Sequence, residues 1–308
     1  MPTNEQIIKS AIETDTLSNG GLLQPWQAKK FLQQTFDNVT LLKQVRHVMR
    51  TEKTGEIDKI GIARRITRGK SENTDDGYRA NVSTSTVEYA TTAVRVPWEI
   101  TEEALRENIE GQNFEKIVTD LMTKQIGLDE EDLCLNSDED TSAESPDYNF
   151  LKLNTGWIKQ ILEGGHVFDA STINSGAMAL DTFYKALATI PNKYNNGNLR
   201  WVMSPRRAQE WELYLLNMIV QQGGAVPDSL YTAPARIPTI ECANISDDKI
   251  LLVDPKNLVE VNSYSVKVRK TTEGVDAIMK DKRFYVVHFD FDPIIEELDA
   301  TCIITGLA

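Results

Sequence analysis

The feature that most constrains the fold is a long polar segment between two strand-like patterns. Residues 63–86 carry very few large apolar side chains, whereas apolar residues alternate on both sides, at Ile60 and Ile62 and again at Val94, Val96, Trp98 and Ile100. Such alternation is typical of half-buried strands. We therefore predict a long hairpin within residues 51–100. Its polar tip cannot pack against its own body and needs a partner surface.

One stretch of this hairpin, residues 59–70, is basic. It holds five bases and no acid, namely Lys59, Arg64, Arg65, Arg68 and Lys70. Two interpretations are open. The segment is a solvated loop of mixed charge, since Glu72, Asp75 and Asp76 follow it. Alternatively, it is an intersubunit contact in which a basic strand lies on an acidic surface of a neighbouring subunit.

The candidate acidic surface is residues 129–147, which contain nine acids and no lysine or arginine. We single out Glu130 and Glu131 as contact candidates. Negative charge is unfavourable at a helix C-terminus unless water solvates it, so we expect this segment to be exposed.

Helices and strands alternate in the rest of the chain. Thr101, Glu102 and Glu103 form a helix start, and an apolar stripe predicts a longer helix from about residue 113 to 135, roughly 35 Å long. Two further helices are predicted at residues 180–190 and after Ser204-Pro205. Strands are predicted around residues 199–204, 249–255, 258–261, 283–292 and 300–307.

Charge and cysteine content exclude several classes of protein. A net charge of −13 argues against a simple nucleic-acid-binding domain, which needs a basic surface. The three cysteines, Cys134, Cys242 and Cys302, lack the spacing of a disulfide framework or a zinc site, so a reducing cytosol fits best. We find no signal peptide and no membrane-spanning apolar run, and we predict no membrane partner.

The sequence also lacks the usual motifs of catalysis. Arg68 to Ser71 read RGKS, but the earlier glycine that a phosphate-binding loop needs is missing, because Arg64 and Arg65 stand there. Residues 138–149 resemble a calcium loop, but the required glycine and final glutamate are missing. We find no GxSxG or HExxH sequence and predict no enzyme, no cofactor and no metal site.

One strand leaves an alternative open. His288, Asp290 and Asp292 alternate with Val287, Phe289 and Phe291, so the polar side chains share one face. That row is either the wet face of a sheet or part of a metal-dependent hydrolase that uses Asp290 and Asp292.

Several short signatures, taken in order, resemble the major capsid proteins of tailed bacteriophages with the Hong Kong 97 type fold. They are the string Gly-Gly-Leu-Leu-x-Pro from Gly20 to Pro25, the polar hairpin, VPWEITEEAL before a long helix with EEDLCLNSD near its end, and the closing FDFDPIIEELDATCIITGLA. The resemblance covers nearly the whole chain.

The resemblance implies an α+β fold with four parts. They are an N-terminal arm at residues 1–50, an extended loop at 51–97, a peripheral domain at 98–170 and 276–308 with a long spine helix, and an axial domain at 171–275. In that family the extended loop reaches over a neighbouring subunit, which explains a hairpin without a packing partner of its own.

The resemblance also implies function and partners. The chain would assemble as pentamers and hexamers of an icosahedral head around double-stranded DNA, in the virion, after assembly in the host cytoplasm. A separate scaffolding protein and a portal are expected partners, and the DNA lies close without specific contacts. Some members crosslink a loop lysine to another subunit, and Lys70 lies near that position. The alternative within the same fold is an encapsulin-like compartment shell.

Overall fold

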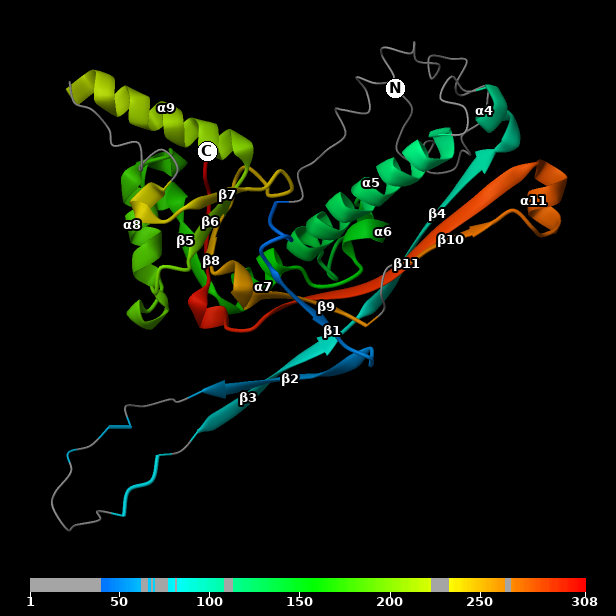
Figure 1. Cartoon of the computed structure of the whole chain (residues 1–308). Helices are drawn as coiled ribbons and strands as arrows, with labels where there is room; N and C mark the ends of the chain where they lie inside the picture. Colours follow the sequence, from blue (N-terminus) through cyan, green and yellow to red (C-terminus); the bar gives the residue numbers. More distant parts are fainter. Residues whose placement is uncertain are drawn as a thin grey trace.

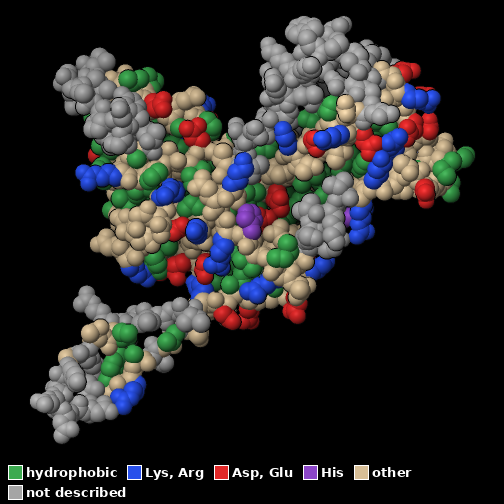
Figure 2. All heavy atoms as spheres, in the orientation of Figure 1, with side chains coloured by type: hydrophobic (Ala, Val, Ile, Leu, Met, Phe, Trp, Pro, Cys, Tyr) green, Lys and Arg blue, Asp and Glu red, His purple; other side chains and the backbone are tan. Residues whose placement is uncertain are grey.

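The computed structural model describes residues 40–61, 66–67, 69, 77–80, 82–107, 113–222, 233–263 and 267–308. Within these ranges the chain forms two packed bodies and a hairpin that projects away from them (Figure 1). In the space-filling view, acidic and basic side chains are interspersed over the visible face of the bodies (Figure 2). None of the helices in the described ranges is both long and apolar enough to cross a membrane.

The first body is built on a five-stranded sheet, here called the β11 sheet, around the long strand β11 (Lys282–Ile295). β11 pairs antiparallel with β10 (Lys267–Thr271), β4 (Thr92–Thr101) and β9 (Leu258–Asn262). β9 in turn pairs parallel with β1 (Arg46–Met49). Val287, Phe289 and Phe291 are buried, as the alternation predicts.

Helix α5 (Phe114–Asn136) packs over this sheet (Figure 1), which confirms the predicted long helix. Helix α4 (Glu102–Glu107) precedes it, and the Ala104 N–H donates to Thr101 Oγ1 at 3.2 Å, so the predicted cap is present. Helices α6 (Tyr148–Leu151) and α7 (Trp157–Gly164) follow. Helix α11 (Val275–Lys280) joins β10 to β11.

The second body holds a smaller sheet, here called the β8 sheet. Its strand order is β5 (His166–Asp169), β12 (Cys302–Thr305), β8 (Ile250–Val253), β6 (Arg200–Met203) and β7 (Thr239–Glu241). Helices α8 (Leu180–Thr189) and α9 (Pro205–Gln222) pack with it, as predicted. In its core Phe183 lies edge-on to Trp201 and Trp211, at centroid distances of 4.9 and 5.0 Å. Short 3-10 helices occur at Ala170–Thr172, Asn174–Gly176, Asn192–Tyr194, Pro234–Arg236, Pro255–Asn257 and Leu298–Ala300.

The projecting hairpin consists of β2 (Thr54–Gly61) and β3 (Ser83–Ala90), paired antiparallel from Thr54 with Ala90 to Gly61 with Ser83. A hairpin is therefore present, but its returning strand was predicted near residue 94 and lies earlier. The strand that contains Val94 to Ile100 is β4, which pairs with β11 instead. Local alternation identified both strands but not their partners.

Strand pairing also departs from the predicted part boundaries. β1 lies inside the stretch predicted as arm, yet it is a strand of the β11 sheet. β9 and β10 lie within the predicted axial segment 171–275 but pair with β11. β5 and β12, predicted as peripheral, pair with each other and join the β8 sheet. Partners distant in sequence decide where each strand belongs.

Candidate functional site

The base of the hairpin is fixed to the first body by an apolar cluster. Ile57 and Tyr89 are each 6% exposed and pack with Val259, Val261 and Ile294 of the β11 sheet. Lys59 adds polar contacts on the same strand, because its ammonium donates to the Glu296 carbonyl and lies 3.3 Å from Glu297 Oε2. The base is therefore rigidly joined to the sheet. The exposed side chains farther along the two strands include Asp58, Thr84, Ser85 and Thr86.

A groove lies between the hairpin base and β11. Glu56 and Glu88 line it and are directly opposite each other in the strand register, where like charges are unfavourable. Glu139 and Asp292 are also among its lining residues. Asp292 Oδ2 accepts the Ala90 N–H at 2.6 Å, so one carboxylate joins the hairpin to the sheet. Burial raises the pKa of Asp292 to about 6.

This pKa shift leads to a testable dependence of stability on pH. The ordinary pKa is 3.8, so the folded chain holds this proton more tightly than the unfolded chain. Stability is therefore lost as the pH rises from about 4 to about 6, and above that the full destabilisation by ionised Asp292 is present. We expect Asp292→Asn to raise the unfolding free energy by about 1–2 kcal/mol at pH 7.5, because water in the groove reduces the full effect. Near pH 4 the two proteins should have similar stability. Urea denaturation at both pH values tests this, and a difference independent of pH would contradict it.

The structure describes only one of the five basic residues that were predicted to contact a neighbouring subunit. Arg64, Arg65, Arg68 and Lys70 lie outside the described residues, as does most of the arm. Lys59 is described and forms the contacts with Glu296 and Glu297 given above. The structure therefore ties Lys59 to its own chain.

The acidic segment was predicted to be exposed, and this is wrong for its first part. Glu131 is fully buried, and its Oε1 accepts the N–H groups of Leu41 at 2.8 Å and Leu42 at 3.2 Å. Burial raises the pKa values of Asp129, Glu130, Glu131 and Asp132. The spine helix packs on the sheet with this acidic end, so Glu131 is not on a surface that a neighbour reaches. Glu139, Asp140, Glu144 and Asp147 are exposed, as predicted.

Glu130 faces Glu260 of β9, and the two side chains share a hydrogen bond. Glu260 Oε2 also lies 2.9 Å from His47 Nδ1, and Glu260 Oε1 accepts from Asn262 at 3.1 Å. His47 and Glu260 are register partners in the parallel pair of β1 and β9. Sequence reasoning missed both residues. Adjacent acids at the end of an otherwise amphipathic helix were the one available signal.

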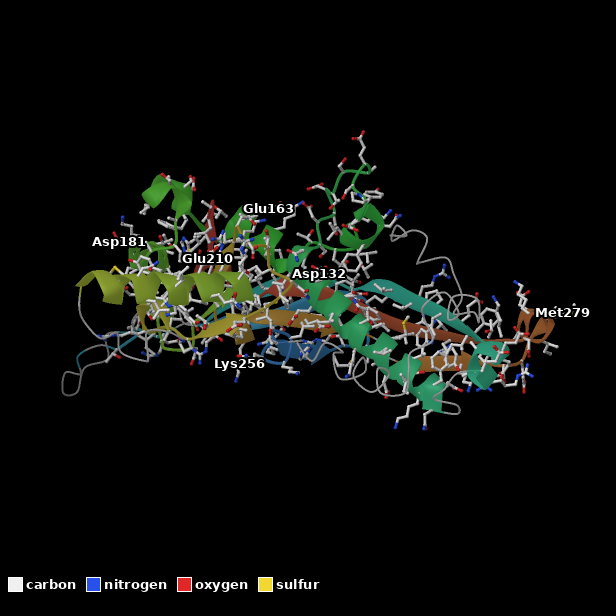
Figure 3. The ribbon with its side chains drawn as sticks, turned by 90° about the horizontal axis from the view of Figure 1, so that it is seen from above. Asp132, Glu163, Asp181, Glu210, Lys256 and Met279 are labelled. Carbon is white, nitrogen blue, oxygen red and sulfur yellow. The ribbon has the colours of Figure 1, made fainter. Side chains whose placement is uncertain are left out.

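Helix α11 presents an exposed apolar tip. Val275, Ile278 and Met279 are 80, 71 and 79% exposed, at the end of the long β10–β11 hairpin. Figure 3 shows Met279 at the extremity of the molecule, far from the labelled Asp181 and Glu210 of the second body. Three large apolar side chains this exposed on one short helix favour a contact with another protein surface.

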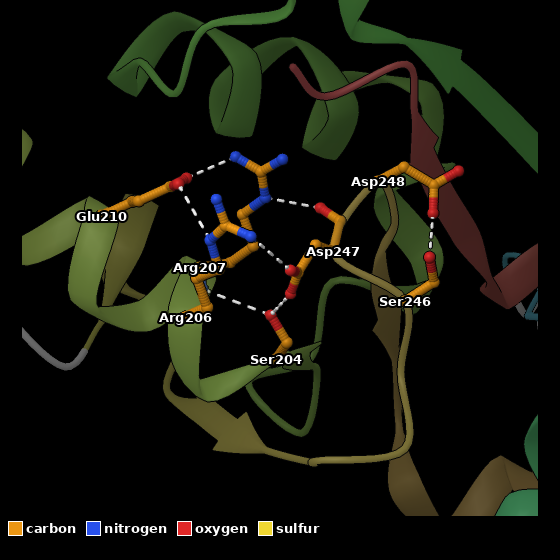
Figure 4. Close-up of polar contacts among 7 residues, drawn as sticks. All are labelled: Ser204, Arg206, Arg207, Glu210, Ser246, Asp247 and Asp248. Atoms are coloured by element: carbon orange, nitrogen blue, oxygen red, sulfur yellow. Dashed lines mark hydrogen bonds and ion pairs between the residues drawn. The ribbon is translucent and has the colours of Figure 1, made fainter. Parts of the chain in front are cut away.

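A polar network lies at the N-terminal end of α9 in the second body (Figure 4). Ser204 Oγ donates to Asp247 Oδ1 at 2.6 Å, and the guanidinium of Arg206 lies 3.2 Å from Asp247 Oδ2. The nearly buried Arg207 donates to the Asp247 carbonyl and to Glu210. The hydrogen bond from Ser204 is the main cause of a lowered pKa at Asp247. These groups satisfy one another and hold the helix in place.

The two aspartates of the hydrolase alternative, Asp290 and Asp292 of β11, form hydrogen bonds with other parts of the chain. Asp290 is 3% exposed, and its carboxylate accepts from the backbone and hydroxyl of Ser263. Asp292 accepts the N–H of Ala90, as described above. In the described ranges, no three His, Cys, Asp or Glu side chains converge in a way that could hold a metal ion. Asp138 and Asp140 of the calcium-like loop both bind the ammonium of Lys159.

Comparison with known proteins adds independent information. No protein-family model matches the chain. The putative prophage capsid protein YqbE of Bacillus subtilis is 26% identical over 318 residues, and the match covers 97% of both sequences. A chain of the satellite phage P4 procapsid is similar in structure with a TM-score of 0.60 and 13% identity, covering 92% of this chain and 99% of that one. A chain of the SrpI encapsulin complex from Synechococcus elongatus gives 0.59 and 12%, with coverages of 92% and 96%.

These similarities extend over almost the full length of the chain. The sequence match supports the resemblance to a phage capsid protein. The structural matches support the fold. Together they confirm the resemblance to the major capsid proteins of tailed phages, and the chain has their α+β fold of the Hong Kong 97 type.

Proposed function

We propose that this chain is the major shell subunit of a tailed-phage head, which assembles as pentamers and hexamers into an icosahedral particle around double-stranded DNA. The observation that carries the proposal is the hairpin, whose base is packed and bonded while residues farther along both strands are exposed. An isolated two-stranded sheet is marginally stable in water, so a neighbouring subunit would complete its packing.

The parts serve this role in different ways. The residues of the predicted peripheral and axial domains supply rigid bodies that meet their equivalents around the symmetry axes. The basic residues of the hairpin would lie on exposed acids of a neighbour. Because Glu131 is buried and Glu130 is only partly exposed, Glu139, Glu144 and Asp147 are the acceptors that we propose. A net charge of −13 keeps packaged DNA from binding tightly to the shell. The role is structural, in the virion, after assembly in the host cytoplasm.

The test is expression of the chain alone and together with the neighbouring scaffold and portal genes. Light scattering and electron microscopy of the products would show closed particles tens of nanometres across. Particles that require the scaffold would support a phage head with a separate scaffolding protein. A chain that remains a monomer under all these conditions would refute the shell function.

The second candidate is an encapsulin-like compartment, which the similarity to the SrpI encapsulin chain favours. Such a shell would close without any phage gene and would enclose protein. Nuclease-protected DNA in particles from infected or induced cells would support the phage head, and a co-purifying protein cargo without DNA would support the compartment.

The α11 tip offers a prediction within the shell proposal. We expect the double variant Ile278→Ser and Met279→Ser to lower particle yield several-fold, because an apolar contact between copies is lost. The unfolding free energy of the subunit should change by less than about 0.5 kcal/mol, since both side chains are more than 70% exposed. Particle counts by electron microscopy and urea denaturation check the two parts. Leu162→Ser, at 41% exposure, is the control and should assemble normally.

A further inference from the structure

The turn at residues 41–45 connects the predicted arm to the β11 sheet, and it is held from two sides. On one side, the N–H groups of Leu41 and Leu42 donate to the buried Glu131 of α5 at 2.8 and 3.2 Å. On the other, the Leu42 carbonyl lies 2.8 Å from His47 Nε2. Within the turn, the Gln44 N–H donates to the Leu41 carbonyl at 2.9 Å.

His47 faces an acceptor at each ring nitrogen. Nε2 faces the Leu42 carbonyl at 2.8 Å, and Nδ1 faces Glu260 Oε2 at 2.9 Å. A carbonyl accepts only, and an ionised carboxylate accepts only, so both hydrogen bonds form at once only when both ring nitrogens carry hydrogen. The bond with Glu260 is the main cause of a raised His47 pKa. The geometry therefore favours the imidazolium.

A second proton is held next to the first. Glu130 and Glu260 are in hydrogen-bond contact, and two carboxyl groups can share a hydrogen bond only if one of them is protonated. Burial raises the pKa of Glu130, whereas the bonds from His47, Glu130 and Asn262 outweigh burial and lower that of Glu260. These opposite directions favour Glu130 as the protonated partner and Glu260 as the carboxylate.

The hydrogen bonds of this cluster depend on its protonation state. Glu260 is 2% exposed and faces His47 from β1 and Glu130 from α5. Cys134 of α5 is fully buried, and burial together with the charges of Glu260, Glu130, Asp292 and Glu131 raises the pKa of its thiol. Ionising Glu130 would place two carboxylates in contact in a buried site. Deprotonating His47, which is about half exposed, would turn one of its two donors into an acceptor that faces an acceptor.

We propose that His47, Glu260 and Glu130 form a proton-dependent latch that holds the turn at residues 41–45 against helix α5 and releases it when the cluster loses its protons. The ligand of this site is the proton itself. In a shell, the latch would set the direction in which the arm leaves the subunit; this consequence rests on the proposed function, whereas the latch itself does not.

The test is amide hydrogen exchange at residues 41–45 in the full-length, unassembled subunit, measured at pH 7 and pH 10 and corrected for intrinsic exchange rates. We expect protection in the wild type to fall by about tenfold or more between the two pH values. Glu130→Gln, which is always neutral and still donates to Glu260, should lose clearly less protection. Glu103→Gln, at an exposed position on α4, is the matched control and should behave as the wild type.

His47→Gln supplies an independent arm, because it keeps one donor and removes the titration of the imidazole ring. Its protection should be low at pH 7 and change little at pH 10. Equal losses in the wild type and Glu130→Gln, or no loss in the wild type, would overturn the latch. Because the subunit is not assembled, failure of this test leaves particle formation by electron microscopy as a separate measure of the proposed function.

Discussion

Replacing Arg64, Arg65, Arg68 and Lys70 together by glutamate is expected to reduce the yield of closed particles to less than about a tenth, because each lost contact recurs at every subunit interface and about 1.4 kcal/mol already changes an equilibrium tenfold. The subunit should remain folded. The clusters that hold the bodies and the hairpin base consist of other residues, such as Ile57 and Tyr89.

The control for this variant has the same change in net charge. Lys116, Lys124, Lys152 and Lys185 are exposed on the helical part of the bodies, and their replacement by glutamate should leave assembly largely intact. Equal loss in both quadruple variants would show a general effect of negative charge and would contradict a specific contact. Particle yield is measured by sedimentation and electron microscopy.

A charge exchange identifies the acceptor surface. Changing Glu139, Glu144 and Asp147 to lysine should also impair assembly when made alone. Combined with the glutamate variant of the hairpin, it should restore part of the yield, since opposite charges again meet across the interface. No rescue would mean that the hairpin lies on another surface of the neighbour.

The sequence was sufficient for elements whose pattern is local. Helix α5 and the buried face of β11 follow from spacing alone, because each buries one stripe or face whose period shows in the sequence. The helix start at Thr101 and the start of α9 after Ser204 follow from capping chemistry.

Partners distant in sequence could not be predicted in this way. Alternation in β4 is the same whether it returns along the hairpin or pairs with β11, and only the distant strand decides. The acids near residue 130 looked like a solvated surface because their partners, Glu260 and the N–H groups of Leu41 and Leu42, lie far away in the chain. Burial of a charge depends on tertiary contacts that composition does not contain.

The largest loss of stability is expected in the β8 sheet, from Trp201→Ala. Trp201 is fully buried on β6, packs edge-on with Phe183, and donates its indole N–H to the Pro234 carbonyl at 2.9 Å. Removing the ring leaves a cavity and an unpaired carbonyl, so we expect the unfolding free energy to fall by about 3–5 kcal/mol in urea denaturation. Tyr184→Ala on α8, where the ring is 49% exposed, is the control and should cost less than about 1 kcal/mol.

Trp201→Phe separates the two causes of that loss. It keeps an aromatic ring against Phe183 but removes the donor to Pro234, so about 1–3 kcal/mol should be lost through the unpaired carbonyl and the smaller ring. Because β12 is paired with β8 in the same sheet and follows β11 in the chain, damage at Trp201 should also loosen the connection between the two bodies. Hydrogen exchange should therefore rise in β11 as well as in the β8 sheet. A rise confined to the β8 sheet would show that the two bodies respond independently.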